Sequence, residues 1–245
     1  MKILTIGDIH GRNNWWKIAK NAIDSYDYIV FTGDYVDSYY IRNEKIVHNL
    51  NKIIQFKLKY PTQVILIWGN HDVQYLSDYY SKQCSGYRAA YALTLHEIFT
   101  KHKTLFQFAF QIENYIWTHA GINDWWYDKF YNMLIELDID TNPDLLADNI
   151  NMLYNSSKFS ILNTVGAIRG GLDYGDILWS DKDENLMLPV RLSLHQIVGH
   201  TPTYHVHRID TNTNGSYTFV DVSWRTKIGY SLDISNLFKL KHRIN

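Results

Sequence analysis

This 245-residue chain is poor in cysteine and proline and contains no long apolar run. Its single cysteine, Cys84, has no partner for an internal disulfide, which is consistent with a reducing compartment. Only four prolines interrupt it, and no linker or repeat divides it. The opening apolar run at residues 2–6 is shorter than a secretory signal needs, and no run reaches the ~18 apolar residues of a membrane span. We therefore expect a cytoplasmic protein whose residues 1–245 form one domain.

The chain also lacks an excess of charge of either sign. It has 24 Lys and Arg against 25 Asp and Glu, a net charge of −1, and the basic residues are scattered. A dedicated nucleic-acid binder would normally carry a basic stripe, so we expect no stable nucleic-acid binding and no membrane partner. A nucleotide substrate is not excluded. What the chain has in abundance is apolar (46%) and aromatic (15%) residues, enough for a sizeable core.

The first seventy residues alternate between short apolar runs and amphipathic segments. The expected strands are residues 2–6, 28–32 and 63–68, and the expected helices between them are residues 13–22 and 43–60. This order predicts a parallel sheet with right-handed crossovers. Ligands of such sheets gather at the carboxyl ends of the strands.

The rest of the chain predicts a second sheet with its own helices. Residues 106–112 and 115–118 are expected to be strands joined by a tight turn, and residues 196–198, 217–222 and 229–234 are expected to be strands of the second sheet. Its expected helices are residues 73–80, 87–103, 125–137 and 143–156, the last two within a helical cap-like insertion at about 122–160, and residues 166–175 form a glycine-rich loop. Two sheets packed face to face and flanked by helices accommodate all these elements in an α/β fold.

Five short polar blocks follow predicted strands and combine glycine with oxygen or nitrogen ligands. They are Gly7-Asp8-Ile9-His10-Gly11, Gly33-Asp34-Tyr35-Val36-Asp37, Gly69-Asn70-His71-Asp72, Thr118-His119-Ala120-Gly121 and Gly199-His200-Thr201-Pro202. Any one of them taken alone is more often a turn, a helix cap or an ordinary core histidine. Their joint occurrence after strands predicts a site for two adjacent metal ions.

The donor types in these blocks suit a dinuclear centre. Asp8 and His10 lie two residues apart and so point to the same side of a strand end, where they could hold one ion. Asp34 has two oxygens and could bridge two ions about 3.5–4 Å apart. The amide of Asn70 and the imidazoles of His119 and His200 suit a second ion of manganese, iron or zinc.

Together the blocks resemble the calcineurin-like metallophosphoesterase superfamily. With the later Leu178-Trp179-Ser180-Asp181 they look like its phosphoprotein phosphatase branch, which includes the serine/threonine phosphatases. The resemblance spans Gly7 to about Pro202. It implies a four-layer α/β/β/α sandwich in which two mixed sheets are flanked by helices.

The resemblance also implies roles and cofactors. Asp8 and His10 would bind the first metal, Asp34 would bridge, and Asn70, His119 and His200 would bind the second. His71 would be the general acid that protonates the leaving oxygen, and Asp37 would orient it. The cofactors would be two divalent ions, manganese first, with iron and zinc as alternatives. A hydroxide between them would attack phosphorus in line with the leaving group.

One departure from the branch concerns phosphate binding. Ser38-Tyr39-Tyr40 stands where the branch usually has an Arg-Gly pair that contacts the substrate phosphate. Arg42, Arg169 and Arg191 are possible substitutes, and glycine-flanked Arg169 is the best because a loop arginine beside glycine can approach an oxyanion closely. Asn70, Arg169 and Arg191 are thus the candidate substrate-binding residues.

These features predict a phosphomonoesterase of the serine/threonine protein phosphatase type, acting on a phosphorylated protein or small phosphoester. The alternative is a nucleotide or dinucleoside polyphosphate hydrolase or a phosphodiesterase, which the absent arginine and the aromatic run Trp125-Trp126-Tyr127 both favour. That run could stack a nucleobase, but packing of a helical cap on the core is preferred.

Several other residues have simpler interpretations. Asp72 is expected to be structural, Cys84 to be a buried thiol, and Arg12 to be solvated or salt-bridged. His205 and His207 are expected at a sheet edge rather than at a metal.

Overall fold

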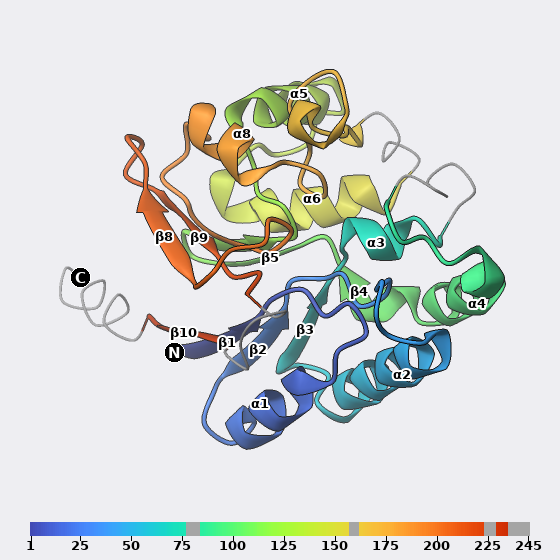
Figure 1. The fold of residues 1–245 in the computed structure, drawn as a ribbon. Coiled ribbons are helices and arrows are strands. Elements are labelled where there is room, and N and C mark those ends of the chain that lie inside the picture. Colours follow the sequence, from blue (N-terminus) through green and yellow to red (C-terminus); the bar gives the residue numbers. More distant parts are fainter. Residues whose placement is uncertain (77–83, 157–161, 223–228, 235–245) are drawn as a thin grey trace.

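The computed structural model describes residues 1–76, 84–156, 162–222 and 229–234, which form two central sheets with helices outside them (Figure 1). Helices α1 and α2 cover the outer side of one sheet, and α5, α6 and α8 lie on the outer side of the other sheet. The predicted four-layer α/β/β/α arrangement of two mixed sheets is therefore confirmed. That the whole chain forms a single domain stays a prediction.

The first sheet has the strand order β10-β1-β2-β3-β4. Neighbours from β1 to β4 are parallel, as the alternation of strands and helices predicted. Its strands are β1 (Lys2–Ile6), β2 (Tyr28–Phe31), β3 (Val64–Ile67), β4 (Phe106–Gln107) and β10 (Tyr230–Asp233), and its outer helices are α1 (Asn14–Ala22) and α2 (Asn43–Lys59).

The second sheet has the order β5-β6-β7-β9-β8. Parallel pairs β6–β7 and β7–β9 lie between the antiparallel pairs β5–β6 and β8–β9. Its strands are β5 (Ala109–Ile112), β6 (Tyr115–Thr118), β7 (His195–Val198), β8 (His207–Asp210) and β9 (Ser216–Phe219). His207 begins the edge strand β8, as its sheet-edge interpretation predicted.

The placement of residues 229–234 in the second sheet was wrong. The strand exists, but β10 pairs antiparallel with β1 at the edge of the first sheet, with Lys2 opposite Asp233 and Thr5 opposite Tyr230. Its side chains alternate between half-buried and exposed. Such a pattern identifies an edge strand but carries no information about which sheet supplies its partner.

The helices match the expected segments with shifted ends. α4 (Ala92–Lys101) and α6 (Leu146–Tyr154) are shorter than predicted, and α5 (Asp124–Glu136) is shifted by one residue. Short 3-10 turns also occur: η1 (Ala89–Tyr91), η2 (Lys103–Leu105), η3 (Pro143–Leu145) and η4 (Ala167–Arg169). The helix expected at 73–80 is instead α3 (Asn70–Val73), and residues 77–83 lie outside the described part. Helix α8 (Lys182–Met187) was not predicted.

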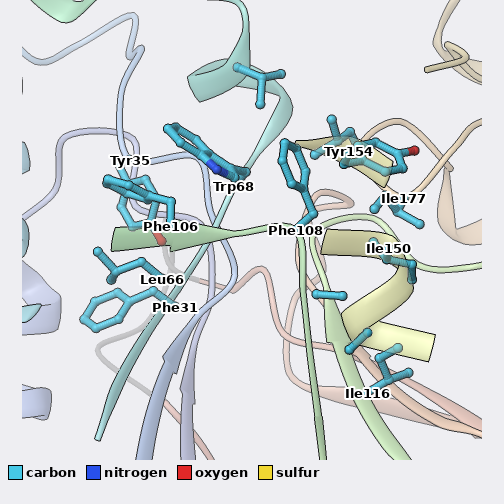
Figure 2. Packing of buried hydrophobic residues seen from close by; sticks show 14 of the residues in the cluster. Phe31, Tyr35, Leu66, Trp68, Phe106, Phe108, Ile116, Ile150, Tyr154 and Ile177 are labelled. Carbon is cyan, nitrogen blue, oxygen red and sulfur yellow. The ribbon is translucent and has the colours of Figure 1, made fainter. Parts of the chain in front are cut away.

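The segment expected as one strand at 106–112 is divided between the two sheets. It breaks at Phe108, so that β4 belongs to the first sheet and β5 to the second. Phe106 stacks on Trp68 at 4.4 Å, whereas the Phe108 ring lies 4.9 Å from Tyr154 of α6, and Figure 2 shows these two groups on either side of the break. The sequence does not reveal such a break, because the same mixture of aromatic residues and glutamine continues on both sides of Phe108.

A side chain replaces the strand partner at this break. Asn151 Oδ1 of α6 accepts hydrogen bonds from the backbone N–H groups of Phe108 (2.7 Å) and Ala109 (3.0 Å). Its Nδ2 donates to the Ala109 carbonyl at 2.8 Å. The crossing between sheets therefore leaves these backbone groups satisfied. None of the helices in the described ranges has the length and apolarity to cross a membrane.

Asn151→Ala should destabilise the protein because it strips three hydrogen bonds from a partly buried backbone. We expect a loss of about 2–4 kcal/mol in the free energy of unfolding, measured by urea denaturation. Asn155→Ala is the matched control, since Asn155 is exposed and only bonds back to the Asn151 carbonyl within its helix. Equal, small losses in both variants would contradict the role given to Asn151.

Candidate metal centre

The polar blocks all lie beyond the carboxyl ends of strands, where the two sheets approach each other. Asp8 and His10 follow β1, Asp34 and Asp37 follow β2, Asn70 and His71 follow β3 and begin α3, His119 follows β6, and His200 follows β7. Two sheets thus contribute to one place, although the chain separates the first block from the last by almost two hundred residues.

The backbone bends sharply at these positions. Among the described residues, seven that are not glycine have positive φ, and four of them are His10 (45°), Asp34 (52°), Asp37 (57°) and His200 (61°). Such conformations are sparsely populated for residues with a Cβ and persist only where the surroundings impose them. Their concentration in the polar blocks marks this region as functional.

Asp34 lies at the centre of the cluster. Its Oδ2 is 3.5 Å from His10 Nε2, its Oδ1 is 3.5 Å from His119 Nε2, and it accepts the His71 backbone N–H at 3.0 Å. Burial raises the pKa of Asp34, whereas the positive charge that the surrounding histidines carry when protonated, His119 foremost, lowers it below the usual range. Gly69 permits the close approach, since a Cβ there would lie 2.2 Å from Asp34 Oδ1.

Two lone pairs face each other beside Asp34 with no proton between them. His119 Nδ1 donates to the Thr32 carbonyl at 2.7 Å, which leaves Nε2 as an acceptor. That Nε2 lies 2.8 Å from Asn70 Oδ1, also an acceptor, because the Asn70 amide nitrogen donates to Cys84 Sγ. Burial lowers the pKa of His119, which keeps the ring neutral. A cation between these atoms would turn the repulsion into coordination, so the donor set fits a metal ion.

His200 and His10 complete the set of inward-facing nitrogens. His200 Nδ1 is 3.2 Å from both Asn70 Oδ1 and His119 Nε2. His10 Nδ1 is 3.0 Å from the carbonyls of Val36 and Asp37, so its proton lies there and Nε2 faces Asp34. Burial lowers the pKa of His10 to about 4, despite Asp34 beside it. Both rings are therefore available as neutral ligands.

His71 and Asp37 form a pair at the edge of the cluster. His71 Nδ1 lies 2.9 Å from Asp37 Oδ2, and the same carboxylate accepts hydrogen bonds from Gln74 Nε2 and the Tyr75 hydroxyl. Burial lowers the pKa of His71, but Asp34 and Asp37 outweigh it and raise the pKa to about 9. Asp37 is thus held by three donors and in turn fixes the imidazole.

Asp8, the other expected ligand of the first metal, lies beside the cluster, and its metal role stays a prediction. The potential ligand atoms that lie within 4.8 Å of one another form two groups among the described residues, His10–Asp34–His71 and Asp34–His119–His200. Asp8 is in neither, because its carboxylate accepts the His200 backbone N–H at 3.1–3.2 Å and lies 3.4 Å from Thr32 Oγ1. These contacts hold the Asp8 carboxylate next to the loop that carries His200.

A cavity of about 440 Å³ opens onto the cluster. His10, Asp34, Asn70, His71 and His200 line it, together with Arg12, Arg169, Ser38, Tyr39 and Tyr40. Arg169 is held there by an ion pair with Asp181 (2.8 Å) and a hydrogen bond to Thr201 Oγ1 (3.2 Å). The structure therefore brings this candidate arginine to the same cavity as the candidate ligands.

A family model described as calcineurin-like phosphoesterase matches residues 1–231. The chain belongs to this family. It is 26% identical over 187 residues to a protein phosphatase 2A catalytic subunit from Dictyostelium discoideum, a match covering 74% of the chain but 49% of the relative. The chain thus spans about half the length of this curated relative. The resemblance to the phosphoprotein phosphatase branch is confirmed by this relative and by the family model.

Solved structures support the fold alone, because their identities are low. A cold-active protein-tyrosine phosphatase of a psychrophilic Shewanella species superposes with a TM-score of 0.54 and 18% identity, over 95% of this chain and 75% of that one. A protein serine/threonine phosphatase from Saccharomyces cerevisiae superposes with a TM-score of 0.50 and 17% identity, over 89% and 67%.

Of the two arginines predicted to bind substrate, Arg169 lines the cavity and Arg191 does not. Arg191 does not reach the cavity: it pairs with Asp124 (3.0 Å) and Asp128 (2.5 Å) of α5 and lies over Tyr127, in a separate hollow. Its predicted role in substrate binding is therefore not supported. Its charge is already matched by two carboxylates that sequence spacing does not place beside it.

Arg12, expected to be solvated or salt-bridged, lies in the cavity wall close to the carboxylates of Asp221 and Asp8. Its Nη2 donates to the Asp8 carbonyl at 3.2 Å, and buried Asp221, which follows β9, also lines the cavity. Burial lowers the pKa of Arg12, against the raising effect of Asp221 and Asp8. Sequence reasoning missed both residues. The signal for Arg12 was its position directly after Gly11, the last residue of the first block.

Trp126 and Cys84 are both buried. Trp126 is fully buried and stacks on Phe130 at 5.0 Å, so the preferred cap-packing interpretation is confirmed. Tyr39 and Tyr40 border the cavity and are 69% and 96% exposed. Cys84 is a buried thiol, as expected, and burial raises its pKa.

Asp34→Asn should remove metal from the protein, because it replaces the only carboxylate common to both ligand groups by a neutral amide. After loading with Mn²⁺ and desalting, we expect the wild type to retain two ions per chain and the variant one or none, counted by plasma mass spectrometry. Asp128→Asn, at an exposed position, is the matched control. Equal metal content in all three proteins would refute a centre built on Asp34.

Proposed function

We propose that this chain hydrolyses phosphomonoesters with two divalent metal ions, in the manner of a serine/threonine protein phosphatase. The observation that carries the proposal is the acceptor-only cluster around Asp34, which opens into a cavity shared with His71 and two arginines. Manganese is the first choice of metal, with iron and zinc as alternatives, because the donors are a mixture of imidazole nitrogen and carboxylate or amide oxygen.

The ligands divide between two positions that share Asp34. Asp8, His10 and Asp34 would hold one ion, and Asn70, His119 and His200 together with Asp34 would hold the other. When bound, such a pair lowers the pKa of a water between the ions and polarises the phosphoryl oxygens. The carbonyls of Thr32, Val36 and Asp37 fix the tautomers of His119 and His10, so these rings present the correct nitrogen without reorganisation.

His71 is placed to deliver a proton to the leaving oxygen. Its Nδ1 is held by Asp37, and its ring lines the cavity beside the ligands. A leaving alkoxide is a poor leaving group and gains most from such an acid. Gln74 and Tyr75 keep the Asp37 carboxylate in position through their own hydrogen bonds.

Arg169 and Arg12 would bind the substrate phosphate in place of the arginine that the branch has at Ser38. Both line the cavity, and both are held by the protein rather than extended into solvent. A guanidinium fixed in this way can donate two hydrogen bonds to one phosphate. Asn70, whose amide is oriented by Cys84, lies in the same wall.

A second function is favoured by Tyr39 and Tyr40. Two exposed aromatic rings at the cavity mouth could stack a nucleobase or an aryl group, which would suit a nucleotide or dinucleoside polyphosphate hydrolase or a phosphodiesterase. The buried Trp126 no longer supports this alternative. Faster cleavage of dinucleoside tetraphosphates or bis-aryl phosphates than of phosphopeptides would establish it.

The proposed setting is the cytoplasm, with a phosphoprotein or a small phosphoester as substrate. Support for the location is limited to the single buried thiol of Cys84, which suits a reducing compartment. A stable complex with nucleic acid is not proposed, since the net charge is −1.

His71→Ala should slow substrates according to their leaving group. With manganese, we expect kcat on an alkyl or serine phosphate to fall about 100-fold or more, but kcat on p-nitrophenyl phosphate to fall much less, because p-nitrophenolate leaves without a proton. Inactivity of the wild type on every monoester would reject the proposed function. An equal loss on both leaving groups would reject only the acid role of His71.

Arg169→Ala should weaken catalysis through lost contacts to phosphate. We expect kcat/KM to fall about 10- to 100-fold, with thermal melts confirming that the variant folds without its Asp181 ion pair. Arg191→Ala, which also breaks an arginine–aspartate pair but far from the cavity, should stay within about twofold of wild type. A larger effect at Arg191 than at Arg169 would reverse the assignment.

A further inference from the structure

A second hollow of about 510 Å³ lies beside the catalytic cavity, between the turn after β1 and helix α2. Both α1 and α2 cover the outer side of the first sheet here (Figure 1). Its lining is entirely uncharged or basic: Gly11, Arg12, Asn13, Asn14, Ile41, Lys45, His48, Asn49 and Lys52. Arg12 also lines the catalytic cavity, so this residue borders both hollows. We call this second hollow the basic groove.

The positive charge of the basic groove is concentrated on one face of α2. Lys45, His48 and Lys52 are spaced by three and four residues, which places them one above another on a helix. No carboxylate contributes to the lining, and neither Lys45 nor Lys52 forms an ion pair within the described ranges. In a chain with a net charge of −1, this is a local excess of positive charge.

The groove is held together by a buried polar network. Trp15 Nε1 of α1 donates to Asn49 Oδ1 at 3.0 Å, and Asn49 Nδ2 donates to the Arg12 carbonyl at 3.0 Å. Asn49 is 3% exposed. The Lys52 ammonium lies 4.0 Å from the centre of the Trp16 ring, which holds it over α1. These contacts fix the distance between α2 and the turn that carries Arg12.

We propose that the basic groove binds a second oxyanion, a phosphate or carboxylate, carried by the same substrate molecule whose phosphate is hydrolysed in the catalytic cavity. The inference rests on the proposed function for the identity of that reaction. Lysines at 45 and 52 supply point charges, and the amides of Asn13 and Asn14 supply neutral donors. Because Arg12 borders both hollows, the second anion lies next to the reacting phosphate. The substrate class is therefore a phosphoester with a neighbouring anionic group.

The experiment compares paired substrates that differ only in the second anion. One pair is a phosphoserine peptide with flanking aspartates and the same peptide with asparagines. The other is an alkyl bisphosphate and the matching alkyl monophosphate. The quantity measured is the ratio of kcat/KM within each pair, so changes in overall activity cancel. We expect the wild type to prefer the anionic member of at least one pair by about fivefold or more at low salt, and the preference to shrink as salt is added.

Lys45→Gln with Lys52→Gln should abolish the preference. Lys101→Gln with Lys103→Gln is the matched control: it removes the same charge from exposed positions that do not line the basic groove and should leave the ratio unchanged. Which pair shows the preference distinguishes an acidic peptide from a small polyanion. Equal kcat/KM within both wild-type pairs, or a preference that survives in the Lys45/Lys52 variant, would overturn the proposal.

Equilibrium binding separates this inference from the proposed function. Non-hydrolysable phosphonate versions of both substrate pairs are titrated calorimetrically into wild type and variants in the presence of manganese. Tighter binding of the anionic member of at least one pair, lost in the Lys45/Lys52 variant, would support the basic groove even if no ester were hydrolysed. Equal binding within both pairs would overturn the groove even if monoester hydrolysis were fast.

Discussion

The arrangement depends on one buried carboxylate. Asp34 is 2% exposed and lies within 3.5 Å of imidazole nitrogens from both sheets. An ionised carboxylate without water is costly unless positive charge surrounds it. Its neighbours His10 and His119 are kept neutral by burial, so they offer lone pairs rather than charge. The protein has therefore collected acceptors around an anion, an arrangement that a bound cation stabilises.

Two sheets are needed to surround Asp34. Strands β1 to β3 carry its own loop and those of His10 and Asn70, while β6 and β7 carry His119 and His200. The chain passes from one sheet to the other at Phe108, where the amide of Asn151 bonds the backbone that neither sheet satisfies. The aromatic packing on either side of Phe108 thus fixes the relative position of the two halves of the metal centre (Figure 2).

Sequence patterns predicted what depends on local periodicity. The parallel strands β1 to β3 and the blocks at their ends follow from apolar runs and glycine, and all six predicted ligands lie just beyond strands of the two sheets. Sequence patterns did not predict which way a side chain turns or which strands pair. The turn of Asp8 toward the His200 N–H joins residues 192 positions apart, and the partner of β10 is likewise non-local. The fold places Arg12 near Asp221 and Asp8 but places Arg191 beside Asp124 and Asp128. Sequence spacing does not predict either set of neighbours.

Ser38 follows Asp37 at the position where the phosphoprotein phosphatase branch usually has an arginine. An arginine in that loop would lie near Asp37 and the protonated His71, adding positive charge beside the proposed acid. In this chain the guanidinium groups come from other elements: Arg169 is tied to Asp181 at the start of α8, and the backbone of Arg12 is tied to Asn49 of α2. The proposed anion-binding residues thus lie toward α2, next to the basic groove. The loop after Asp37 carries two exposed tyrosines that border the cavity, where the proposed second function would use them to stack an aromatic group.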